Sequence, residues 1–117
     1  MLKRIYLPKR RNKYGAIKSK CWSGHIHDSK AEQRYCDQLY LLKKNGDILN
    51  YEIQVPYQMI VSGKKITKYI VDFLVFMKDG KLEAREVKSK ITKTATWNIK
   101  RKLFEALYPE IKHVVIE

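Results

Sequence analysis

The segment YIVDFLVFMKDGKLEAREVKSK, residues 69–90, constrains the fold more than any other part of the chain. A run of β-branched and aromatic residues, a turn containing Asp-Gly and a second run predict two paired strands with a buried face. Charged side chains are costly in such a setting unless something compensates them. Yet Asp72 lies inside the first run, and Glu86 and Lys88 lie near the end of the second. The pairing register of the strands therefore decides how these charges meet.

The apolar pattern distinguishes two registers. A two-residue loop would place Leu74 opposite an arginine, whereas a three-residue loop over residues 78–80 places it opposite Ala84. A slip of one residue moves a whole set of side chains to the other face of a sheet. We therefore predict the three-residue loop, with its glycine in the left-handed position of a type I turn followed by a bulge. In this register Asp72 faces Glu86 directly.

Two carboxylates that are directly opposed on a sheet repel each other unless a cation lies between them. Hard oxygen ligands at this separation suit Mg²⁺, with Mn²⁺ as a substitute. Lys88 follows Glu86 by two residues and points to the same side, where it can hold a water molecule or a phosphate. These residues are typical of metal-dependent phosphodiester hydrolysis. The alternative interpretation is a salt-bridge ladder at the strand ends.

A helix is predicted over residues 30–45. Ser29 is a good N-cap, and Glu32 completes a capping box three residues later. The apolar stripe of this helix has helical spacing and consists of Ala31, Tyr35, Leu39 and Leu42, with Cys36 beside it.

Three strands, a second helix and a last strand follow. The predicted strands span residues 48–61, 66–77, 81–89 and 113–117. Pro56 indicates that the first of them is an edge strand or is bulged. The second helix spans residues 96–107 and has on one side Ile99, Leu103, Ala106 and Leu107. This order predicts an α/β fold (α+β mixed) with a mixed central sheet flanked by helices, formed by a core over 29–117 that follows a basic arm and connector over 1–28.

The charge of the chain favours a polyanionic partner. Lysine and arginine total 25 against 12 acids, a formal charge of +13. Eight of these basic residues and no acid lie within residues 1–20, a segment that is either a strap on a phosphate backbone or a solvated tail. No apolar run is long enough to cross a membrane, and the basic N-terminus lacks the large apolar helix face that membrane binding requires. We therefore predict nucleic acid, and no membrane, as the partner.

The chain has two cysteines and no signal-peptide pattern, which predicts reduced thiols in a cytoplasmic protein. Cys21, His25, His27 and Cys36 are conceivable zinc ligands. Their spacing matches none of the usual zinc-finger patterns, so a zinc site is not expected from the sequence.

The set of motifs resembles the PD-(D/E)XK nuclease superfamily, with Asp72 on one strand, Glu86-Val87-Lys88 on the next and Glu32 on the preceding helix. More narrowly, the chain resembles a family of small phage proteins assigned to this superfamily. The segments that carry this resemblance are KYG (13–15), DSKAEQRY (28–35), Gln54, YIVDF (69–73), EVKS (86–89) and KLFEALYP (102–109). The residue before Asp72 is valine rather than the proline found in part of the superfamily.

The resemblance implies an αβββαβ restriction-endonuclease-like core and a role for each motif residue. The implied Mg²⁺ ligands are Asp72, Glu86, the Val87 carbonyl and, through water or a second metal, Glu32. Lys88 would orient or deprotonate the attacking water, and Gln54 would be an accessory residue. For Glu32, a purely structural role as a helix cap is the alternative.

The resemblance further implies a DNA endonuclease, structure-selective and homodimeric so that two strands are cut, in the host cytoplasm if it is phage-encoded. Holliday-junction resolution in phage DNA metabolism is the best single expectation. A non-catalytic nucleic-acid-binding protein and a sequence-specific nicking or restriction-type endonuclease are the alternatives. The residues expected to contact DNA are Lys9, Arg10, Arg11, Lys13, Lys93, Lys100 and Arg101.

Overall fold

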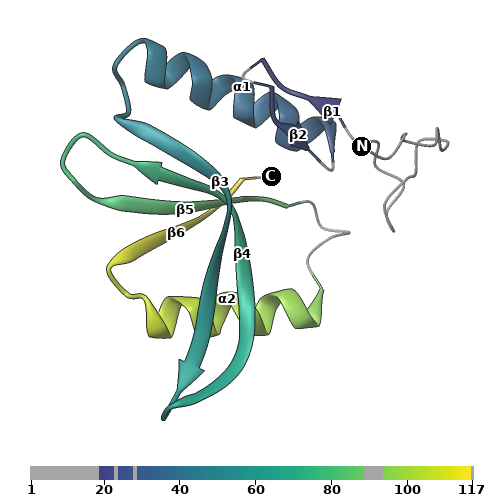
Figure 1. Cartoon of the computed structure of the whole chain (residues 1–117), viewed down its shortest axis with the longest axis vertical. Coiled ribbons are helices and arrows are strands. Elements are labelled where there is room, and N and C mark those ends of the chain that lie inside the picture. Colours follow the sequence, from purple (N-terminus) through teal and green to yellow (C-terminus); the bar gives the residue numbers. More distant parts are fainter. Residues whose placement is uncertain (1–18, 23, 28, 89–93, 117) are drawn as a thin grey trace, which may run out of the picture.

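A computed structural model of the chain describes residues 19–22, 24–27, 29–88 and 94–116. The predicted order of helix, three strands, helix and strand is confirmed, and a short hairpin precedes it (Figure 1). The elements are β1 (Ser19–Lys20), β2 (Ile26–His27), α1 (Lys30–Lys44), β3 (Asn50–Val61), β4 (Lys64–Phe76), β5 (Leu82–Val87), α2 (Ala95–Leu107) and β6 (Ile111–Ile116).

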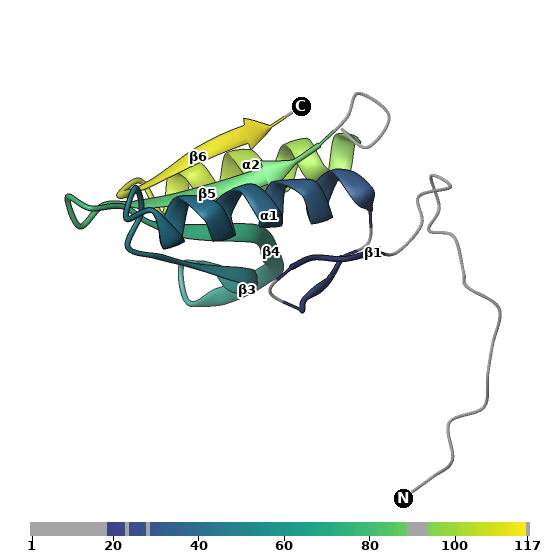
Figure 2. The ribbon, with the colours of Figure 1, turned by 90° about the horizontal axis from the view of Figure 1, so that it is seen from above.

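The central sheet is mixed, as predicted, with the strand order β3-β4-β5-β6. The β3–β4 and β4–β5 pairs are antiparallel, whereas β5 and β6 are parallel. A parallel pair needs a crossover connection, and α2 supplies it. The sheet lies between the two helices, with α1 on one face and α2 on the other (Figures 1 and 2). The fold is therefore a three-layer α/β arrangement.

Alternating side chains of the central strands supply both faces of the sheet with apolar contacts. On the α1 side, Phe73 and Val75 pack with Tyr35 and Leu39. On the α2 side, Leu74 and Ala84 pack with Trp97 and Phe104, while Met59 and Ile111 extend the same cluster. Each helix thus buries its apolar side against one face of the sheet.

The β4–β5 hairpin has the predicted register. Leu74 pairs with Ala84 and Phe76 pairs with Leu82. The Met77 N–H donates to the Lys81 carbonyl at 2.9 Å, which leaves three residues in the loop. Gly80 has φ +85°, a left-handed conformation that costs glycine little.

Helix α1 begins as predicted, because the Ser29 Oγ accepts a hydrogen bond from the Glu32 N–H. The stripe proposed for it is wrong at its first position, since Ala31 is exposed, whereas Cys36 is fully buried. The reason is that the β1–β2 hairpin packs against the Cys36 side of α1 and extends the covered surface. Residues of the predicted connector therefore contribute to the α1-side cluster, as the buried Cys21 does.

The stripe predicted for α2 is also partly wrong. Leu103 and Leu107 are partly buried, but Ile99 is 67% exposed and Ala106 is exposed. The most buried residues of the helix are Trp97 and Phe104, which lie seven positions apart and so on one face. Aromatic packing selects this face, because the Phe104 ring lies 5.2–5.3 Å from the rings of Tyr57 and Tyr69.

Strand β3 is an edge of the sheet, as Pro56 predicts. It follows the long first half of β4 down to a two-residue turn at Ser62-Gly63, where Val61 pairs with Lys64. Among the described residues, no helix is long and apolar enough to cross a membrane.

Candidate functional site

The site is centred on Asp72 and Glu86, at the point where the regular β4–β5 pairing ends. The last regular pair joins Phe73 to Arg85, so the next position along the strands sets Asp72 against Glu86. The Asp72 N–H donates to Glu86 Oε1 at 3.3 Å, and the Val87 N–H donates to Asp72 Oδ2 at 3.0 Å. Asp72 is 9% exposed and Glu86 is 1% exposed. The two carboxyl groups are therefore held together away from water.

Burial disfavours the ionised form of both carboxyl groups. Desolvation, followed by the charge of Asp72, raises the pKa of Glu86 to about 9 from an ordinary value of 4.5. Desolvation also raises the pKa of Asp72, although hydrogen bonds from its neighbours oppose the shift. Two close carboxyl groups in a low-dielectric setting resist ionising together, so they favour a shared proton or a bound cation.

Lys88 is the cation whose charge lowers the pKa of both acids. Its backbone N–H donates to the Ile116 carbonyl at 2.9 Å, which fixes the end of β5 beside β6. Its Nζ lies 5.7 Å from the centre of the Trp97 ring, and the Arg101 guanidinium lies 5.6 Å from the same centre. The Trp97 indole therefore positions two cations at the start of α2.

The sheet is distorted at the same position. Gln54 of β3 lies opposite Asp72, between the regular pairs Ile53–Phe73 and Val55–Val71, and has φ +50°. This conformation is unusual for a residue with a side chain and indicates local strain. The Gln54 side chain hydrogen-bonds to Asp72 and helps to lower the pKa of Asp72. The predicted accessory residue therefore contacts the site from the edge strand.

The distortion also changes which side chains of β4 face α2. Val71 and Tyr69 belong to the α2-side cluster together with Leu74, while Phe73 belongs to the α1-side cluster. Regular alternation would place Tyr69, Val71 and Phe73 on one face. Regular alternation would also place Ile70 on the face of Asp72 and Leu74, but the distortion prevents this and Ile70 is exposed.

Tyr69 is a site residue that the sequence analysis missed. Its hydroxyl hydrogen-bonds to Glu86 and lies 3.0 Å from His113 Nε2. Burial, with the charge of Glu86, raises the pKa of Tyr69 well above its ordinary value, so the phenol stays protonated. No local signal identifies Tyr69, because strand alternation assigns it to the face opposite Asp72.

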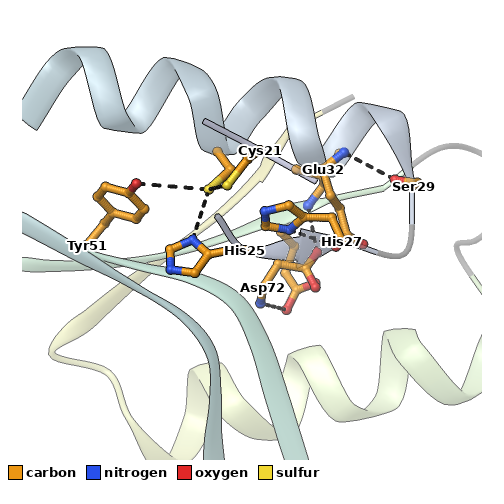
Figure 3. Close-up of polar contacts among 10 residues, drawn as sticks. Cys21, His25, His27, Ser29, Glu32, Tyr51 and Asp72 are labelled. Carbon is orange, nitrogen blue, oxygen red and sulfur yellow. Dashed lines mark hydrogen bonds and ion pairs between the residues drawn. The ribbon is translucent and has the colours of Figure 1, made fainter. Parts of the chain in front are cut away.

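Glu32 extends from α1 toward the strands, beside His27 (Figure 3). Its backbone N–H is the group that Ser29 caps, and its side chain is 14% exposed. Glu32 Oε2 lies 3.9 Å from His27 Nδ1. The residue therefore combines a capped backbone with a carboxylate that is directed into the interior.

The residues expected to contact DNA are only partly described. On α2, Lys100 is half-buried and the Arg101 guanidinium pairs with Glu105 at 2.9 Å. The remaining five lie outside the described residues and comprise Lys9, Arg10, Arg11, Lys13 and Lys93.

The fold and site thus define a small mixed α/β domain with a buried acidic pair beside a lysine. A family model described as "Protein of unknown function (DUF1064)" matches residues 11–117, nearly the whole chain, and the protein belongs to this family. No curated protein and no solved structure gives a significant match.

Proposed function

We propose that this protein is a Mg²⁺-dependent DNA endonuclease that hydrolyses phosphodiester bonds. The observation that carries the proposal is the buried Asp72–Glu86 pair, opposed on adjacent strands and accompanied by the half-buried Lys88. A salt-bridge ladder at exposed strand ends would be solvated, whereas this pair is buried and lacks water to offset its repulsion. Burial of two acids beside one lysine is the arrangement expected of a site that binds a divalent cation.

The donor set fits Mg²⁺, because the carboxylates of Asp72 and Glu86 are hard oxygen ligands, and the carbonyl of Val87, which follows Glu86 in the chain, is another. When bound, Mg²⁺ would polarise the scissile phosphate and lower the pKa of a coordinated water. Mn²⁺ would substitute. The pair is kept in place by the Val87 N–H on Asp72 and by the Tyr69 hydroxyl on Glu86.

The surrounding residues would act on the water and the phosphate. Among the described residues, Lys88 lies over the Trp97 ring and makes no close ion pair, so its ammonium group would orient the attacking water or bind a phosphate oxygen. Glu32 would accept a hydrogen bond from a metal-bound water, and Gln54 would orient Asp72 from the edge strand. In this proposal the backbone of Glu32 takes part in the cap of α1, and its carboxylate takes part in the metal site.

The charge of +13 supports DNA as the substrate, since phosphate contacts by lysine and arginine dominate nucleic-acid affinity. A core of this size has little room for a module that reads sequence. We therefore favour branched DNA, with four-way junctions first, and a homodimer that would cut two strands. Sequence-specific nicking is the alternative within the same chemistry.

The direct test is a cleavage assay with Mg²⁺ on duplex, flap, fork, single-stranded and four-way-junction DNA. We expect wild type to cut at least one branched substrate and to be inactive in chelator. Cleavage that depends on one sequence in plain duplex would favour the restriction-type alternative. Binding of all substrates without any cleavage would favour a non-catalytic nucleic-acid-binding protein.

The matched variants are Asp72→Asn and Asp79→Asn, the same change in the site and in the exposed loop of one hairpin. Asp72→Asn should abolish cleavage, keep most DNA affinity and lose the rise in melting temperature that Mg²⁺ gives wild type. Without Mg²⁺ it should be at least as stable as wild type, because the charge of Asp72, which opposes the ionisation of Glu86, is gone. Asp79→Asn should behave as wild type. An Asp72→Asn protein that still cuts DNA would refute the mechanism.

A further inference from the structure

Four side chains with metal-binding chemistry meet where the β1–β2 hairpin packs against α1. The ligand atoms of Cys21, His25, His27 and Cys36 all lie within 4.8 Å of one another. Cys21 Sγ lies 3.2 Å from Cys36 Sγ, and His25 Nδ1 lies 3.5 Å from Cys36 Sγ (Figure 3). We propose that these residues bind one structural Zn²⁺ ion.

The distances suit a tetrahedral zinc ion. Bonds of about 2.3 Å to sulfur and 2.0–2.1 Å to nitrogen place neighbouring ligand atoms roughly 3.3–3.8 Å apart. Two pairs in the cluster, Cys21–Cys36 and His25–Cys36, are already near that range. Two thiolates and two imidazoles are softer donors than the carboxylates of the acidic pair, so the two sites would select different metals.

The local backbone brings the ligands together. The Gly24 N–H donates to the Cys21 carbonyl at 3.0 Å, and the Cys21 N–H donates to the His25 carbonyl at 2.9 Å. Gly24 has φ +94°, which permits the tight turn between β1 and β2. The turn therefore sets Cys21 and His25 close together and leaves His27 two residues further along β2. Helix α1 adds Cys36 from across the interface.

Groups around the proposed ligands support them, as outer groups do in known zinc sites. His27 Nδ1 faces Glu32 Oε2 at 3.9 Å, so a carboxylate lies behind one imidazole. The Trp22 N–H donates to Asp37 Oδ1 at 2.8 Å, which fastens the hairpin to α1 next to Cys36. The Tyr51 hydroxyl lies 4.0 Å from Cys36 Sγ on the strand side. The cluster is thus supported from the helix and from the sheet.

Burial indicates a structural rather than a catalytic metal. Cys21, His27 and Cys36 are buried, and His25 is half-buried. A closed site with four protein ligands leaves no open position for a substrate. Its role would be to fix the β1–β2 hairpin, and with it the point where the basic arm joins the core. Because His27 contacts Glu32, the ion would also help to orient that carboxylate.

The first test measures the metal content of tag-free protein, purified under reducing conditions, by mass spectrometry of the elements. We expect about one zinc per chain, and a lower melting temperature after chelation that zinc restores. Cobalt-substituted protein should show the intense visible bands of a tetrahedral ion and thiolate-to-cobalt charge transfer. Reduced protein that binds no stoichiometric zinc, or a cobalt spectrum typical of six oxygen ligands, would overturn the proposal.

Variants locate the ion. Cys36→Ser should weaken zinc binding at least about 10-fold, whereas Glu86→Gln should retain one zinc per chain. The reverse pattern would place the metal at the acidic pair and refute the site. If Cys36→Ser fails to fold, thiol labelling of the wild-type protein tests whether the cysteines bind zinc. Both cysteines should be protected from the labelling reagent until zinc is removed. A native disulfide between Cys21 and Cys36 in freshly purified protein would overturn the proposal. None of these readouts depends on DNA cleavage.

Discussion

At the scale of single residues, the acidic pair is governed by desolvation. Glu86 loses nearly all contact with water and gains a carboxyl neighbour, and both effects favour its protonated form. The pair is therefore destabilising when fully ionised and is relieved by a proton or a cation. The same property that makes Asp72 and Glu86 suitable as metal ligands should make the metal-free fold sensitive to pH.

The pH dependence follows from the direction of this shift. The folded-state pKa of Glu86 is about 9 and its ordinary value is 4.5, so the folded protein binds more protons in that window. Glu86 therefore contributes stability at low pH that is lost as the pH rises through the window. Without Mg²⁺, the free energy of unfolding of wild type should fall relative to that of Glu86→Gln between about pH 5 and 9. Urea titrations of both proteins at a series of pH values would measure this difference in the free energy of unfolding.

Comparison with Glu86→Gln is needed because other groups titrate in the same range. Burial lowers the pKa of His113, which makes an opposite contribution near neutral pH, and this contribution is common to both proteins. Parallel stability curves for the two proteins would show that Glu86 has an ordinary pKa.

Glu32 offers a second test at this scale. Glu32→Gln keeps the backbone N–H that Ser29 caps and removes only the negative charge. We expect a nearly unchanged melting temperature and cleavage reduced about 10–100-fold, the effect of losing an outer-shell group. Ser29→Ala is the control, since it should cost about 1 kcal/mol of stability and spare cleavage. Full activity of Glu32→Gln would leave the residue as a helix cap alone.

At the scale of elements, the β4–β5 hairpin positions the site. Its three-residue loop sets the register, and the register places Asp72 opposite Glu86. The edge strand adds a distortion at Gln54, which redirects Tyr69 toward Glu86. A regular hairpin would supply the two acids, but only the distorted sheet supplies the hydroxyl that holds one of them.

The loop can be tested by Gly80→Val. A β-branched residue at φ +85° should destabilise the fold by about 1–2 kcal/mol or more, measured by thermal or urea unfolding. Lys78→Val places the same side chain in the same exposed loop, at a residue without a positive φ, and should have little effect. Equal stability of the two variants would contradict the left-handed conformation at Gly80.

At the scale of the whole molecule, two helices enclose a four-stranded mixed sheet (Figure 1). The proposed site lies where the regular β4–β5 pairing ends. The basic arm enters this body at β1, next to the cysteine and histidine cluster. Seven basic residues precede β1, so much of the net charge of +13 belongs to the arm. We therefore expect the core to carry out the proposed hydrolysis, and both the core and the arm to contact the phosphates of DNA.

Deletion of residues 1–18 tests this division. If the arm binds the DNA backbone, the slope of log affinity against log salt concentration should become shallower in the truncated protein. The magnitude of the slope should fall by up to about 6 if all seven charges neutralise phosphates. Cutting at residue 18 leaves β1 and Cys21 intact, so zinc content and melting temperature should not change. A truncated protein that keeps the full salt slope would identify the arm as a solvated tail.

The sequence by itself determined the order of elements, the helix start at Ser29 and the register of the hairpin. These features depend on neighbours in the chain, because a slip of one residue in register would set Leu74 opposite Arg85 and Phe76 opposite Glu83. Tertiary structure alone decided three other features. They are the face that α2 buries, the turning of Tyr69 toward Glu86, and the meeting of Cys21, His25 and His27 with Cys36. Each depends on contacts between segments that are distant in sequence, which no local periodicity or motif spacing encodes.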